Sequence, residues 1–172
     1  MFGSIKTHGM KNTVFKERVI MKINWINPPI TGQPFVAIVH INNYKIGFVY
    51  NKKRRVWELP GGHVNPCDSS LLKAAVREYK EEVGICPPKN IKYYLTAKNV
   101  SNKEPNQYSF CHFFVCESKN NDKKIKNIRF FSSIPENTLF SRRSYQKIID
   151  EIYSMMPICS KNNLHSWESE SL

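Results

Sequence analysis

The sequence predicts a single α+β domain, because short β-rich apolar runs alternate with two segments of helical periodicity. Its 172 residues, of which 41% are apolar, suffice to bury one core without disulfides or a structural metal. The patterned part of the chain spans residues 17–156. Residues 1–16 and 157–172 are polar and poorly patterned, so we expect a flexible N-terminal segment and a disordered C-terminal tail.

The predicted strands are runs rich in β-branched and aromatic residues, bounded by turn residues. They comprise residues 18–25, 35–41, 44–50, 56–59, 91–97, 108–117 and 128–131. Asn42 and Asn43 separate the second run from the third, which predicts a two-residue hairpin turn.

The first predicted helix spans residues 69–83. Its expected buried stripe consists of Leu72, Val76, Tyr79 and Val83. Its candidate N-caps are Asp68, Ser69 and Ser70. Gly84 stands where a helix usually ends.

The second predicted helix spans residues 142–155. Its apolar face consists of Tyr145, Ile148, Ile149 and Ile152. A continuous face of this kind is typical of a helix that packs on a sheet.

The chain carries a net charge of +12, from 26 basic and 14 acidic residues. A lysine-rich composition without functional meaning is the leading interpretation of this excess, and affinity for a polyanion, either RNA or a phosphate-rich substrate, is the alternative. The five cysteines show no metal spacing, and no segment resembles a secretion signal or a membrane span. We therefore expect a cytoplasmic protein with reduced thiols and no membrane partner, and the sequence does not indicate an oligomeric state.

Four of the 14 acidic residues crowd into one short stretch of this basic chain. They are Asp68, Glu78, Glu81 and Glu82. Helical spacing places the three glutamates on one face, where they repel each other and oppose the helix dipole. A hard divalent cation such as Mg²⁺ would relieve this repulsion. The alternative is a solvated acidic face on which Arg77 pairs with Glu81.

Residues 62–85 resemble the Nudix box, in which a glycine, five residues, a glutamate and seven residues precede an Arg-Glu-apolar-x-Glu-Glu-x-Gly-apolar motif. The second half of the box, from Arg77 onward, matches at every defined position, and the preceding run WELPGG resembles the family's approach strand. The interval from Gly62 to Arg77 is one residue too long. Counting back from Arg77 places the box's first glutamate on Ser69, whereas counting forward from Gly62 places it on Asp68. We interpret this as a one-residue insertion.

The resemblance implies an αβα sandwich with a mixed central β-sheet and a catalytic loop–helix–loop. It implies Mg²⁺ as cofactor, with Mn²⁺ able to replace it. The implied metal ligands are Glu78, Glu81, Glu82 and the backbone of Gly62. The implied catalytic residues are Glu81 or Glu82 as base, and Arg77 as the residue that positions a glutamate. Further candidate acids are Asp68, Asp122 and, less strongly, Glu104.

The reaction implied by the resemblance is hydrolysis of a phosphoanhydride bond in a nucleoside-diphosphate-linked substrate. The leading hypothesis is a nucleoside triphosphate, including an oxidised purine nucleotide, cleaved to a monophosphate and pyrophosphate. Alternatives are pyrophosphate or cap removal from the 5′ end of RNA, hydrolysis of ADP-ribose or a nucleotide sugar, and a non-catalytic Nudix-like binding module.

Substrate binding is assigned to Arg54, Arg55 and Trp57, in and beside the basic run that also contains Lys52 and Lys53. A solvated basic loop is the alternative for this run. Three aromatic residues are candidates for stacking a base, with core packing as the alternative for each: Phe35, Trp57 and Phe113.

Overall fold

The computed structural model describes residues 19–23, 33–100, 108–118 and 125–156. In chain order the elements are β1 (Val19–Ile23), β2 (Phe35–Asn42), β3 (Lys45–Asn51), β4 (Val56–Glu58), β5 (Gly61–His63), α1 (Leu71–Val83), β6 (Lys92–Val100), β7 (Tyr108–Ser118), β8 (Arg129–Phe131) and α2 (Arg142–Met155). The predicted tails and two of the candidate acids, Asp122 and Glu104, lie outside the described residues.

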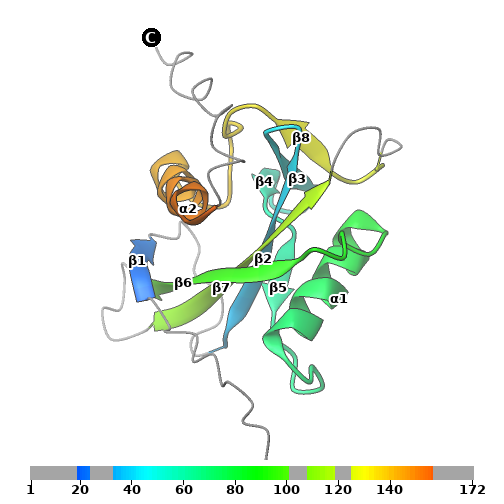
Figure 1. The fold of residues 1–172 in the computed structure, drawn as a ribbon, viewed down its shortest axis with the longest axis vertical. Helices are drawn as coiled ribbons and strands as arrows, with labels where there is room; N and C mark the ends of the chain where they lie inside the picture. Colours follow the sequence, from blue (N-terminus) through cyan, green and yellow to red (C-terminus); the bar gives the residue numbers. More distant parts are fainter. Residues whose placement is uncertain (1–18, 24–32, 101–107, 119–124, 157–172) are drawn as a thin grey trace, which may run out of the picture.

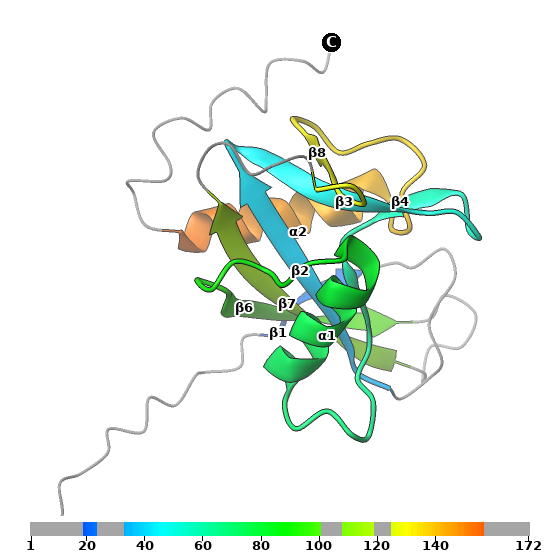
Figure 2. The ribbon, with the colours of Figure 1, turned by 90° about the vertical axis from the view of Figure 1, so that its right-hand side faces the viewer.

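The strands form one mixed sheet in the order β1-β6-β7-β2-β3-β4, with β5 paired to β2 and β8 paired to β3. Strands β1 and β6 run parallel, as do β2 and β7, whereas the other pairs are antiparallel. Helices α1 and α2 lie on opposite sides of this sheet (Figure 1, Figure 2). The predicted α+β fold with an αβα sandwich is therefore confirmed.

Two apolar clusters fill the two sides of the sheet, and strand alternation explains how β2 contributes to both. Val36 and Ile38 belong to the cluster that contains the buried residues of α1. Ala37 and Val39 belong to the larger cluster, which contains the buried residues of α2. A strand that is buried on both faces reads as a continuous apolar run, as β2 does.

Helix α2 has the predicted bounds and the predicted buried face, whose four members Tyr145, Ile148, Ile149 and Ile152 are at most 1% exposed. Its N-cap is Ser141, whose side chain accepts a hydrogen bond from the backbone of Ser144.

Helix α1 begins two residues later than predicted, at Leu71, with Ser70 as its N-cap. It ends at Gly84, which has φ of 85°. The prediction that Leu72 is buried is wrong, because this side chain is 40% exposed. Ala74 and Ala75 are buried instead, and such small side chains let a helix backbone approach a sheet closely.

The β2–β3 hairpin turns one residue later than predicted, at Asn43 and Tyr44, which both have positive φ. This register places Ile41 opposite Ile46 and leaves Tyr44 in the exposed turn. Local patterns do not predict strand β5, since its sequence Gly61-Gly62-His63 carries no β-rich signal. In the part of the chain that the structure describes, no helix is long and apolar enough to cross a membrane.

The close approach of α1 to the sheet leads to a prediction about stability. Replacing Ala75, which is 1% exposed, with leucine should destabilise the protein by about 1–3 kcal/mol, because the larger side chain overpacks the interface. Leu72→Ala on the outer side of the same helix should change the free energy of unfolding by less than about 0.5 kcal/mol. Urea denaturation measures both, and a larger loss for Leu72→Ala than for Ala75→Leu would contradict this packing.

Candidate active site

The site is built around the backbone of Gly61 and Gly62, which passes between β2 and helix α1. A Cβ atom on Gly61 would overlap the carbonyl group of Val36, and one on Gly62 would overlap the carboxylate of Glu78. Only glycine fits at position 61, where the neighbour is backbone, whereas a side chain at position 62 would displace the Glu78 carboxylate. Strand β5 therefore brings main-chain polar groups next to the acidic face of α1.

Glu82 is the α1 glutamate whose carboxylate accepts a hydrogen bond from the backbone of β5, from Gly61 N at 2.9 Å. The pKa of Glu82 is raised to about 7, mainly by burial and also by the negative charges of Glu58, Glu78 and Glu81, whereas the Gly61 hydrogen bond lowers it. The charge of the ionised carboxylate is therefore not balanced by the described side chains around it.

Glu78 and Glu81 lie next to Arg77 but differ in exposure. The Glu78 side chain is 15% exposed, and its Oε1 accepts a hydrogen bond from Arg77 Nη1 at 2.7 Å. The Glu81 side chain is 58% exposed and lies 3.4 Å from the same nitrogen. Thus Arg77 holds Glu78 closely and leaves Glu81 largely in solvent.

Arg77 connects the loop before α1 to the helix. Its Nε and Nη2 donate to the two carboxylate oxygens of Asp68 at 3.1 and 2.8 Å, and Nη2 also donates to the His63 carbonyl at 3.0 Å. The hydrogen bonds from Arg77 are the main reason that the pKa of Asp68 is lowered, and the backbone N–H of Asn65 lowers it further. This fork-like pairing fixes both the loop and the guanidinium.

The same contacts show how the one-residue insertion is accommodated. Asp68 keeps the spacing from Gly62 that the box requires and is the acid that pairs with Arg77. Ser69 is exposed, and the helix begins after Ser70. The extra residue therefore lies between Asp68 and α1.

Glu58 is a site residue that the sequence did not single out. It is buried, and its carboxylate accepts hydrogen bonds from Asn51 Nδ2 at 2.7 Å and Arg54 Nη1 at 3.5 Å. Burial raises its pKa, and these two partners lower it by a smaller amount. The alternation of side chains in β4 could have indicated its position. Trp57 packs on the α2 side of the sheet, so its neighbour Glu58 faces the α1 side.

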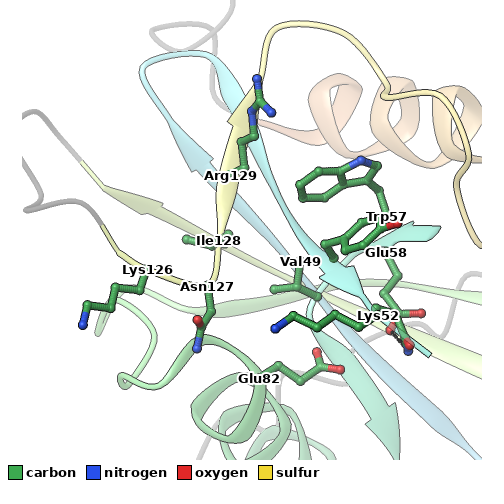
Figure 3. A pocket seen from close by; sticks show the side chains of 11 residues that line it. Val49, Lys52, Trp57, Glu58, Glu82, Lys126, Asn127, Ile128 and Arg129 are labelled. Atoms are coloured by element: carbon green, nitrogen blue, oxygen red, sulfur yellow. Dashed lines mark hydrogen bonds between the residues drawn. The ribbon is translucent and has the colours of Figure 1, made fainter. Parts of the chain in front are cut away.

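A pocket of about 640 Å³ opens beside Glu82 and Glu58 (Figure 3). The residues that line it come from β3, the β3–β4 turn, β4, α1 and the segment that leads into β8: Val49, Tyr50, Asn51, Lys52, Trp57, Glu58, Glu82, Lys126, Asn127, Ile128 and Arg129. A volume of this size is typical of small-molecule sites.

The residues assigned to the substrate fall into two groups. Trp57 lines the pocket, as does Lys52 from the basic run. Arg54 and Arg55 are exposed and do not line it, and Arg54 pairs with Glu58 instead.

Among the three stacking candidates, Phe35 and Phe113 are packed in the core, at 8% and 0% exposure. Sequence reasoning missed Lys126 and Arg129, because only the pairing of β8 with β3 brings them to the pocket.

The donor chemistry of the site fits a divalent cation. Carboxylate oxygens are the ligands that Mg²⁺ prefers, and the carboxylates of Glu78 and Glu82 lie against the Gly61–Gly62 backbone. Within the described residues, no three histidine, cysteine or acidic side chains form a ready-made metal cluster. Glu81 is more exposed than Glu78 and is held only by long contacts with Arg77, so its side chain is able to turn toward Glu78 and Glu82.

Comparisons with known proteins were made for both sequence and fold. The sequence model of the NUDIX domain matches residues 34–143, more than half of the chain. Comparison with curated protein sequences gave no match.

Among solved structures, a mutant form of the pyrophosphohydrolase BsRppH of Bacillus subtilis is similar, with a TM-score of 0.54 and 22% identity over 77% of this chain and 89% of that chain. The NUDIX domain of Shewanella oneidensis NrtR, crystallised with ADP ribose, has a TM-score of 0.53 and 17% identity over 75% of this chain and 93% of that one. A MutT/nudix family protein from Enterococcus faecalis has a TM-score of 0.51 and 19% identity over 74% and 64%.

The αβα fold, the Gly61–Gly62 backbone and the acidic helix beside it are features of a Nudix domain. Because the NUDIX domain model matches more than half of the chain, this protein belongs to the Nudix hydrolase family.

The pairing of Asp68 with Arg77 predicts a role for Asp68 in activity. Asp68→Ala should lower kcat about 10- to 100-fold, as losses of residues that orient metal ligands usually do, because Arg77 would no longer be fixed beside Glu78. Ser69→Ala, at the other position that counting assigns to the box's first glutamate, should leave kcat unchanged. Steady-state kinetics of the two variants measures the difference, and equal losses would contradict the assignment to Asp68.

Proposed function

We propose that this protein catalyses the Mg²⁺-dependent hydrolysis of a phosphoanhydride bond in a nucleoside-diphosphate-linked substrate. The proposed substrate is a nucleoside triphosphate, including oxidised purine forms, which is cleaved to a monophosphate and pyrophosphate. The observation that carries this proposal is the placement of the Glu78 and Glu82 carboxylates against the Gly61–Gly62 backbone, with Glu82 in the wall of the pocket. A bound cation would stabilise this arrangement, which otherwise costs stability.

The proposed metal ligands are Glu78, Glu81, Glu82 and the carbonyl group of Gly62. When bound, Mg²⁺ polarises the phosphoryl oxygens and makes a coordinated water more acidic. Arg77 keeps Glu78 in place through its 2.7 Å hydrogen bond. In the proposed reaction the water oxygen bonds to phosphorus as the bridging P–O bond breaks, and Glu81 or Glu82 accepts the proton of the water.

The choice of a nucleotide rests on the pocket. Its volume of about 640 Å³ is suitable for a nucleotide, and Trp57 is among the residues that line it. The proteins with similar folds have different functions: one is a pyrophosphohydrolase, and another is a domain crystallised with ADP ribose. The tests below distinguish this proposal from three alternatives: ADP-ribose or nucleotide-sugar hydrolysis, RNA 5′-end pyrophosphohydrolysis or decapping, and a non-catalytic Nudix-like binding module.

The metal-site assignment predicts that Glu82→Gln abolishes most turnover. The loss in kcat should be on the order of a thousandfold, because several kcal/mol of transition-state stabilisation depend on the metal. The matched control is Glu136→Gln, an exposed acid that does not line the pocket. Circular dichroism checks that both variants are folded, and wild-type turnover by Glu82→Gln would refute the assignment.

The proposed substrate and cofactor predict a specific product pattern. With Mg²⁺, the protein should convert nucleoside triphosphates to monophosphate and pyrophosphate faster than it converts ADP-ribose, and EDTA should stop the reaction until Mg²⁺ or Mn²⁺ is restored. Ion-exchange chromatography of the products distinguishes these cases. Preferential turnover of ADP-ribose would favour that alternative, and the absence of any turnover would favour a binding module.

A further inference from the structure

We propose that Lys52 and Lys126 form a phosphate clamp that selects substrates with a terminal triphosphate over substrates with an internal diphosphate bridge. This inference rests on the proposed function, since it names the group that the same pocket binds beside the acidic site. The clamp would hold the phosphates of the pyrophosphate that leaves.

The two lysines reach one pocket from two separate parts of the chain. Lys52 belongs to the β3–β4 turn, whereas Lys126 lies in the segment before β8. Pairing of Phe48 with Arg129, the first residue of β8, joins β8 to β3 and brings the segment before β8 to the pocket. Figure 3 shows Lys52 and Lys126 on two sides of the pocket, with Glu82 at one end.

The charges of these residues are not neutralised within the described part of the chain. The ion pairs found there involve Arg54 and Arg77, and none involves Lys52, Lys126 or Arg129. The guanidinium of Arg129 lies 5.2 Å from the centre of the Phe131 ring, which packs on the α2 side of the sheet. Arg129 therefore faces away from Glu82 and does not belong to the clamp. By contrast, Arg54 lies in the same turn as Lys52 and is paired with Glu58.

The balance of charge in the pocket favours an anionic ligand with several phosphates. Of the two carboxylates that line it, Glu58 is paired with Arg54, and Glu82 belongs to the proposed metal site. Two cations, Lys52 and Lys126, therefore remain for the ligand. Lysine and arginine bind phosphate oxygens through charge-assisted hydrogen bonds, and a terminal triphosphate offers more such oxygens and more charge than a diphosphate bridge.

Position within the basic turn, rather than positive charge alone, is the feature that assigns Lys52 to the clamp. Lys53 is its neighbour, is exposed, and does not line the pocket. Lys147 on α2 is likewise exposed and away from the pocket. These two lysines are matched controls, because their replacement removes the same net charge from the protein.

The first test measures binding without catalysis. Isothermal titration calorimetry with inorganic tripolyphosphate, in the absence of a divalent metal, should give tighter binding than with pyrophosphate. Lys52→Gln and Lys126→Gln should each weaken tripolyphosphate binding about three- to tenfold, whereas Lys53→Gln and Lys147→Gln should leave it unchanged. Equal effects of all four replacements would overturn the clamp, since they would indicate a general effect of net charge.

The second test uses kinetics with Mg²⁺. Lys52→Gln and Lys126→Gln should raise KM for a nucleoside triphosphate more than KM for ADP-ribose. A 5′-triphosphorylated RNA is tested as well, because it also carries a terminal triphosphate. A steep loss of affinity with salt for RNA only would identify RNA as the ligand that makes further contacts. If no substrate is hydrolysed but tripolyphosphate binding depends on Lys52 and Lys126, the proposed function fails and the clamp stands. If triphosphates are hydrolysed and the lysine variants match their controls, the clamp fails and the proposed function stands.

Discussion

The hydrogen bonds of a single guanidinium hold the acidic site together. Arg77 donates to Asp68 and the His63 carbonyl on the loop side and to Glu78 on the helix side. Because these partners precede and follow the start of α1, this one side chain joins the loop to the acidic face of the helix. The carboxylates around Glu82 repel each other, and the pairing of Arg77 with Glu78 offsets part of this repulsion.

The second organising feature is the edge of the sheet, where β3 is shared by β4 and β8. Beyond this pairing, the segment before β8 diverges from β3 and leaves the pocket between them. One wall of the pocket thus carries the basic turn and Trp57, and the other carries Lys126 and Arg129. The acidic and basic halves of the site are placed by different parts of the fold: the first by the loop and helix of the box, the second by strand pairing.

Local patterns predicted the fold class, both helices and the box, since these depend on residues close together in the sequence. Helix α2 has its predicted bounds and buried face because its apolar face is continuous and packs on a single sheet. Leu72 was misplaced because periodicity weighs a large apolar side chain above an alanine, whereas close packing required Ala74 and Ala75 at the interface. Lys126 and Arg129 could not be assigned to the site, because their distance from Lys52 is set by the β3–β8 pairing, which no local pattern reveals.

The extra residue between Asp68 and α1 has a consequence for how such proteins are recognised and how they diversify. Lengthening a connection by one residue adds little to the free energy of closing it, provided that the groups at its two ends still meet. Here the aspartate–arginine fork still closes, so the chain tolerates a change that a rigid consensus with fixed gaps would reject. Searches for distant relatives should therefore require contact between the acid and the arginine, and should allow the number of residues between them to vary.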